Sequence, residues 1–79
     1  MDEKRYLFRG KDVTENVLEK IDDVYAVNSR QLNVSLKDAE MLFNDSEIYK
    51  NVLESETGLW AQSAEYIADH YFEEIGIKS

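Results

Sequence analysis

Residues suited to packing recur every three or four positions along the last third of the chain, and this spacing is the strongest constraint on its fold. Such a stripe covers one face of an α-helix and needs another element to pack against. Gly76 follows the stripe, where a glycine commonly closes a helix in the left-handed conformation. The pattern predicts a helix at about residues 58–75, with a packing face of Leu59, Trp60, Ser63, Ala64, Ile67, Ala68, Tyr71 and Ile75.

The same periodicity marks an earlier helix at about residues 12–27. Asp12 is a suitable helix cap, and Glu15 stands three residues later, where its carboxylate can return the capping bond. Asn28-Ser29 is expected to end this helix. Its apolar stripe consists of Val13, Val17, Leu18, Ile21, Val24 and Tyr25.

Two short helices are expected between these long ones. Ser35 followed by Asp38 resembles a capping box and predicts a helix start. Asn44-Asp45-Ser46 ends that helix and caps the next, which carries Ile48, Tyr49, Val52 and Leu53. The short turns predict a mainly α fold, a small helical bundle of about four helices in a single domain spanning residues 1–79.

A short β element is the alternative addition to this bundle. Residues 5–9 form a short apolar run with charged ends, and residues 31–35 alternate apolar and polar side chains with the period of two that is typical of strands. Pairing of these two segments would make the fold α+β. Alternatively, the second segment only leads into the helix that follows it.

Composition excludes most catalytic classes. The chain has 79 residues, with no Cys, one His and three Gly. Without cysteine there is no zinc ribbon, iron–sulfur cluster, disulfide framework or thiol nucleophile. The few glycines provide neither a phosphate-binding loop nor a Gly-x-Ser-x-Gly elbow. His70 with Glu73 or Glu74 would bind a metal only weakly, because a di-iron bundle needs two Glu-x-x-His pairs. We therefore expect no enzymatic activity, no metal and no cofactor.

Charge is distributed unevenly along the chain. The formal net charge is −8, and residues 1–37 are balanced. Residues 38–79 carry ten acids against only Lys50 and Lys78. Direct nucleic-acid binding is therefore not expected, since phosphate contacts need clustered bases and a helix-turn-helix reader around residues 47–53 would have Lys50 alone.

Glu65, Asp69 and Glu73 fall at i, i+4 and i+8, one above another on the last helix. The row has two interpretations: a solvated face that aids solubility, or a face that meets a basic partner. In the second, the partner-binding acidic face comprises Glu65, Asp69, Glu73, Glu74, Glu54 and Glu47, and an aromatic rim comprises Tyr66 and Phe72.

Two functional hypotheses follow from this charge pattern. The first is a non-enzymatic module that engages a basic surface of a partner protein, in its sharpest form a nucleic-acid mimic that inhibits a DNA- or RNA-binding enzyme. Small acidic anti-restriction and anti-CRISPR proteins of phages and mobile elements have this general character. The alternative is an assembly or regulatory module that acts through apolar helix packing, as a homodimer or hetero-complex. The sequence has no leader-like segment and no apolar run long enough to span a membrane, so we expect a cytoplasmic protein.

Overall fold

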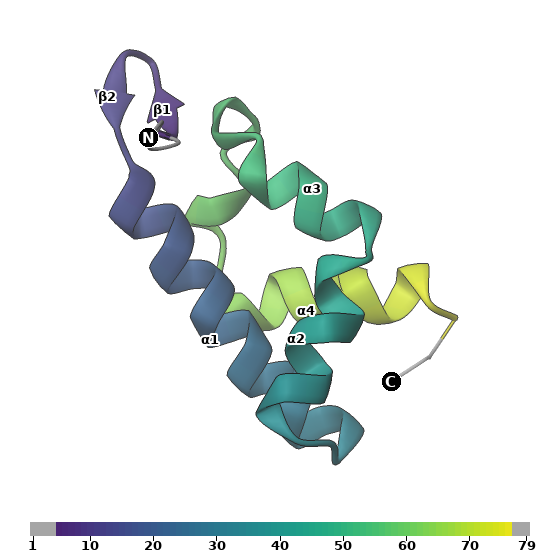
Figure 1. Ribbon diagram of the computed structural model, residues 1–79. Helices are drawn as coiled ribbons and strands as arrows, with labels where there is room; N and C mark the ends of the chain where they lie inside the picture. Colours follow the sequence, from purple (N-terminus) through teal and green to yellow (C-terminus); the bar gives the residue numbers. More distant parts are fainter. Residues whose placement is uncertain (1–4, 77–79) are drawn as a thin grey trace.

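The computed structural model describes residues 5–76 and contains four α-helices and one two-stranded sheet in this part of the chain (Figure 1). The predicted small helical bundle with a two-stranded β addition is confirmed. The elements in chain order are β1 (Leu7–Phe8), β2 (Lys11–Asp12), α1 (Thr14–Leu32), α2 (Leu36–Asn44), α3 (Glu47–Leu53), the 3₁₀ turns η1 (Ser55–Thr57) and η2 (Leu59–Ala61), and α4 (Ala64–Glu74).

The sheet does not have the predicted partner. β1 pairs antiparallel with β2, with Leu7 opposite Asp12, so the expected pairing of residues 5–9 with 31–35 is wrong. Arg9 and Gly10 both have positive φ, 51° and 83°, which is the geometry of a two-residue hairpin turn. A hairpin this tight closes at a smaller entropic cost than a pairing across more than twenty residues. Residues 31–32 instead complete α1.

α1 continues past the predicted stop at Asn28-Ser29 and ends at Leu32. The signal for its end lies later, at Asn33, which adopts the left-handed conformation with φ 57°. Asn28 is fully buried within the helix, so packing has overridden its local tendency to end a helix.

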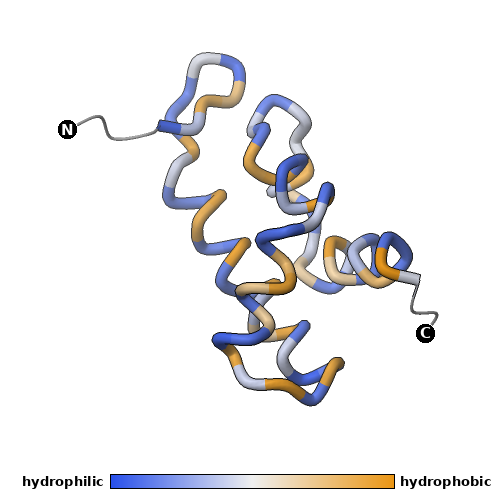
Figure 2. The backbone as a smooth tube through the Cα atoms, turned by 45° about the vertical axis from the view of Figure 1, so that its right-hand side comes forward, coloured by the Kyte–Doolittle hydropathy of each residue, from blue (hydrophilic) through white to orange (hydrophobic). Residues whose placement is uncertain are grey.

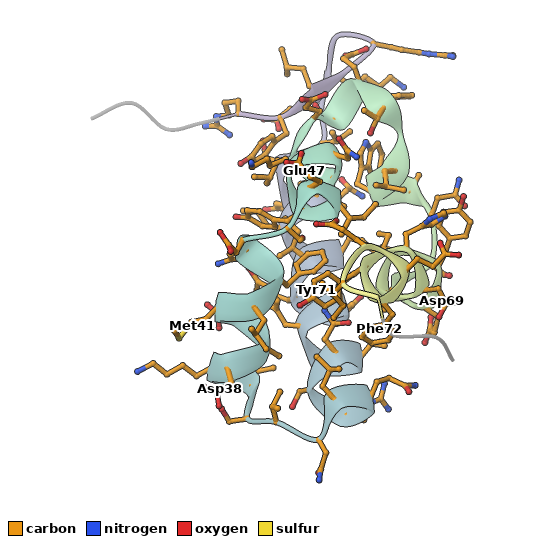
Figure 3. All side chains as sticks on the ribbon, turned by 90° about the vertical axis from the view of Figure 1, so that its right-hand side faces the viewer. Asp38, Met41, Glu47, Asp69, Tyr71 and Phe72 are labelled. Atoms are coloured by element: carbon orange, nitrogen blue, oxygen red, sulfur yellow. The ribbon has the colours of Figure 1, made fainter. Side chains whose placement is uncertain are left out.

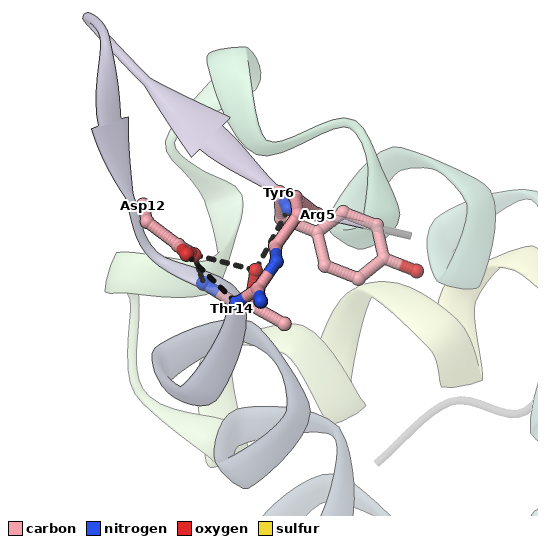
Figure 4. A network of polar contacts seen from close by, with 4 residues as sticks. All are labelled: Arg5, Tyr6, Asp12 and Thr14. Atoms are coloured by element: carbon pink, nitrogen blue, oxygen red, sulfur yellow. Dashed lines mark hydrogen bonds and ion pairs between the residues drawn. The ribbon is translucent and has the colours of Figure 1, made fainter. Parts of the chain in front are cut away.

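Asp12 stabilises the entry to α1 without capping the helix in the predicted way. The N-cap position belongs to Val13, and the Asp12 carboxylate accepts hydrogen bonds from the Thr14 backbone N–H and hydroxyl at 2.9 and 2.6 Å. The Thr14 hydroxyl oxygen accepts in turn from the Tyr6 N–H, and Arg5 lies 3.1 Å from Asp12 (Figure 4). The hydrogen bonds from Thr14, supported by the Arg5 charge, hold the pKa of Asp12 below its usual range.

Serine caps start the other three helices. The side-chain oxygens of Ser35, Ser46 and Ser63 accept hydrogen bonds from backbone N–H groups three residues later, which confirms the predicted starts after Ser35 and Ser46. α4 was predicted from residue 58 but begins at Ala64, because residues 55–61 form two 3₁₀ turns on either side of Gly58, whose φ is 74°. Gly76 takes the expected left-handed conformation after α4.

The core lies where α2 and α4 pack against α1. Figure 2 shows hydrophobic and hydrophilic stretches alternating along the helices, as amphipathic packing requires. Phe43 is at the centre and makes edge-to-face ring contacts with Tyr25, Tyr49 and Tyr71. Burial, with smaller contributions from Tyr49 and Glu40, raises the pKa of Tyr25 to about 12, so its hydroxyl stays protonated and donates to Asn44 Oδ1. Burial also raises the pKa of Tyr71.

The hairpin is attached to the 3₁₀ turns. The Phe8 ring packs edge-to-face on Trp60, with 5.7 Å between ring centroids. The Ser55 hydroxyl donates to the Leu7 carbonyl, and the Trp60 indole N–H donates to the Ser55 carbonyl at 2.8 Å. These contacts fix the loop that leads into α4 and so position the surface described next.

Candidate partner-binding surface

The predicted acidic row is exposed on α4. Glu65, Asp69 and Glu73 lie on successive turns and are all solvent-exposed, whereas the opposite face of the helix is buried against the core. Figure 3 shows Asp69 at the outer side of α4 and Tyr71 pointing inward. Within residues 5–76, neither Glu65 nor Asp69 has a basic side chain at ion-pair distance. Glu65, Asp69 and Glu73 together are called the acid row below.

Glu73 has a local partner. Its Oε1 atom lies 3.3 Å from His70 Nδ1, and the Tyr66 ring packs on His70 with 4.6 Å between centroids. Both members of the Glu73–His70 pair are exposed, so the contact contributes little to stability. No group of three or more metal-binding side chains occurs in the described part of the chain.

Glu74, also predicted to belong to the partner-binding face, makes two hydrogen bonds within the fold. Its two carboxylate oxygens accept hydrogen bonds from the backbone N–H groups of Glu47 and Ile48, at 2.8 and 2.9 Å. These are among the first N–H groups of α3, which have no partner inside their own helix. Glu74 therefore joins the end of α4 to the start of α3.

Replacing Glu74 with alanine is expected to lower the free energy of unfolding by about 1 kcal/mol, because two backbone donors of α3 lose a charged acceptor. Urea titration followed by circular dichroism measures the change. Glu73→Ala is the matched control, since it removes the neighbouring carboxylate and only an exposed contact. Equal midpoints for the two variants would contradict the role given to Glu74.

The remaining predicted acids lie on α3 and at its end. The Glu47 carboxylate lies 3.6 Å from the Lys50 ammonium, an exposed pair three residues apart. Glu54 is exposed at the C-terminal end of α3. The six predicted acids therefore form three groups. Three make up the acid row of α4, Glu74 accepts hydrogen bonds from the start of α3, and Glu47 and Glu54 lie at the two ends of α3.

The two residues of the predicted aromatic rim differ in exposure. Tyr66 is 46% exposed beside the acid row, but Phe72 is 7% exposed and belongs to the core. Phe72 lies on the border of the buried α4 stripe, belongs to the core cluster, and packs with its ring against Tyr71. The helix periodicity did not determine how wide the covered arc would be.

An open groove of about 520 Å³ lies between α3, the 3₁₀ turns and α4. Sequence reasoning did not identify it, because its walls come from three segments that only the tertiary fold brings together. Its lining combines apolar side chains, neutral amides and two rings, and we call it the α3–α4 groove. The lining residues are Ile48, Asn51, Thr57, Gly58, Leu59, Gln62, Tyr66 and His70.

Comparison with known proteins provides no relative. The chain matches no protein-family model, and no curated protein or solved structure is significantly similar to it. Among the described residues, no helix has both the length and the apolar character needed to cross a bilayer.

Proposed function

We propose that this protein is a non-enzymatic binding module that uses the acid row of α4 to engage a basic surface of a protein partner. The observation that carries the proposal is the set of three exposed carboxylates on successive turns. Like charges at i, i+4 cost a helix about 0.2–0.5 kcal/mol per pair. A row that lowers helix stability is more readily explained when a basic partner neutralises it.

The sharpest form of the proposal is inhibition by charge mimicry. Carboxylates held at regular spacing along a rigid helix present an array of negative charge comparable to a run of phosphates. A DNA- or RNA-binding enzyme would then bind α4 in place of its nucleic acid. Nothing in this mechanism needs catalysis, a metal or a cofactor.

Neutralising the acid row is expected to weaken binding of the partner. The variant Glu65→Gln/Asp69→Asn/Glu73→Gln keeps side-chain size and removes three charges. The control Glu15→Gln/Glu19→Gln/Asp22→Asn removes three charges from exposed positions of α1. Immobilised wild-type protein is exposed to host lysate and washed with rising salt, and the retained proteins are identified by mass spectrometry. Each retained protein is then purified and titrated against the wild type and both variants.

We expect the α4 variant to lose at least about tenfold in affinity and the α1 variant to change little, because a close charge pair outweighs a distant one. Affinity should fall steeply between low and high salt. Nucleic acid bound by the partner should compete if the mimicry form is correct. Unchanged binding by the α4 variant, or binding that is flat with salt, would exclude the proposal.

Apolar assembly is the second candidate function, and α2 offers the surface for it. Ala64, Ile67, Ala68 and Tyr71 of the α4 stripe are buried in the core, whereas the apolar side chains of α2 are more exposed. About half or more of each of Leu36, Met41 and Leu42 is exposed. A partner that survives high salt, or concentration-dependent self-association in sedimentation experiments, would favour this candidate.

A further inference from the structure

The α3–α4 groove adjoins the acid row and differs from it in chemistry. Tyr66 and His70 stand at i and i+4 on α4 and form one wall, next to the acid row on the same helix. Ile48 and Leu59 contribute apolar surface from α3 and η2. Neutral amides come from Asn51 and Gln62. A side chain entering here would meet aromatic rings, hydrocarbon and amide groups together.

The surroundings of the groove are negative. Glu73 contacts His70 of the groove wall, and Glu47 and Glu54 lie four residues before and three after Asn51, on the same face of α3. Residues 47–74 carry one Lys and no Arg, and Lys50 lies beside Glu47. The groove therefore complements a cation and disfavours an anion.

We propose that the α3–α4 groove binds an arginine side chain from an exposed segment of the protein partner, with the guanidinium group over the Tyr66 ring. This proposal rests on the basic partner proposed above and specifies how that partner is held. The acid row would supply long-range attraction, and the groove would supply the contact that selects one segment of the basic surface.

Arginine matches this lining better than lysine does. The planar guanidinium stacks on aromatic rings and offers several N–H donors, which suit the amide oxygens of Asn51 and Gln62 and the Glu73 carboxylate. Its three-carbon stem can lie on the apolar surface of Ile48 and Leu59. A lysine ammonium is a compact and strongly hydrated charge that gains less from a ring face.

The test uses the full chain and a five-residue peptide with both ends capped. Its sequence is Gly-Leu-Arg-Leu-Gly. A peptide in which citrulline replaces the arginine keeps the shape and removes the charge. Titrations are followed by ¹H–¹⁵N correlation spectra of the labelled protein. We expect shift changes at the backbone amides of Asn51, Gly58, Tyr66 and His70 with the arginine peptide, and much weaker binding of the citrulline peptide.

Tyr66→Ala should weaken binding of the arginine peptide by about fivefold or more, whereas Tyr66→Phe, which keeps the ring face, should stay within about twofold of the wild type. Both substitutions are at a half-exposed position, and Met41→Ala on α2 is the control for surface changes. Equal affinities for arginine and citrulline, shifts confined to α2 or the acid row, or no effect of Tyr66→Ala would each overturn the groove proposal.

The outcome separates this inference from the proposed function. If the acid-row variant no longer binds the partner but Tyr66→Ala still does, the proposed function is supported. The groove is then not the site at which the partner binds. If the arginine peptide binds through Tyr66 but the acid-row variant binds the partner as tightly as the wild type, the groove is supported as an arginine site. The proposed charge-based function is then wrong.

Discussion

Replacing Phe43 with alanine is expected to remove a large share of the stability of this protein. Phe43 is fully buried and contacts three tyrosine rings, with centroid distances of 6.0, 5.6 and 5.2 Å to Tyr25, Tyr49 and Tyr71. Truncating a buried phenylalanine costs about 3–5 kcal/mol, and each lost ring pair adds to the effect of lost area. A domain of this size has only about 4–12 kcal/mol in total, at roughly 0.05–0.15 kcal/mol per residue.

Chemical denaturation measures this loss. Trp60 fluorescence and far-ultraviolet circular dichroism report the unfolding midpoint in urea, and Phe43→Leu provides a graded variant that stays measurable if the alanine variant does not fold. Met41→Ala, on the same helix but 63% exposed, should change stability by less than about 0.5 kcal/mol. Equal midpoints for Phe43→Leu and the wild type would contradict a central role for this ring.

Replacing Asn28 with leucine is expected to raise the melting temperature. Asn28 is fully buried on α1, and within the described residues neither its side-chain nitrogen nor its oxygen has a hydrogen-bond partner. A buried polar group without a partner costs about 1–3 kcal/mol, and an apolar side chain of similar shape avoids that cost. In a domain of this size each kcal/mol shifts the melting temperature by about 4–8 °C.

Differential scanning calorimetry tests this expectation, with Asn16→Leu at an exposed position of the same helix as the matched control. A rise confined to Asn28→Leu would confirm that the buried amide destabilises the fold. A lower melting temperature would show that the amide makes favourable hydrogen bonds in solution and would contradict the prediction.

The position of Asn28 also explains why the length of α1 was not predictable. Asparagine next to serine is a local signal that competes with helical hydrogen bonding, and it predicted a stop at residue 28. In the folded chain this side chain is buried, and continuing the helix places Leu32 against the core. Burial across several turns outweighs the preference of one residue.

The candidate functional residues also divide into those predictable from local sequence and those that depend on the folded chain. The exposed acid row followed from a spacing of four, because residues four apart on a helix always share a face. The roles of Glu74 and Phe72 did not follow. Glu74 accepts from residues 26 and 27 positions earlier in the chain, and Phe72 is covered by other elements.

Features whose interactions span only a few residues could be predicted from the amino-acid sequence. These include the helix starts after Ser35 and Ser46, the left-handed Gly76 after α4, and the row of carboxylates along that helix. Four features instead depend on the folded chain: the strand partner, the length of α1, the burial of Phe72 and the α3–α4 groove. The difference lies in the sequence separation of the interacting residues. Capping hydrogen bonds and helix faces depend on neighbours three or four residues away. Burial and grooves depend on segments that meet only after the chain has folded.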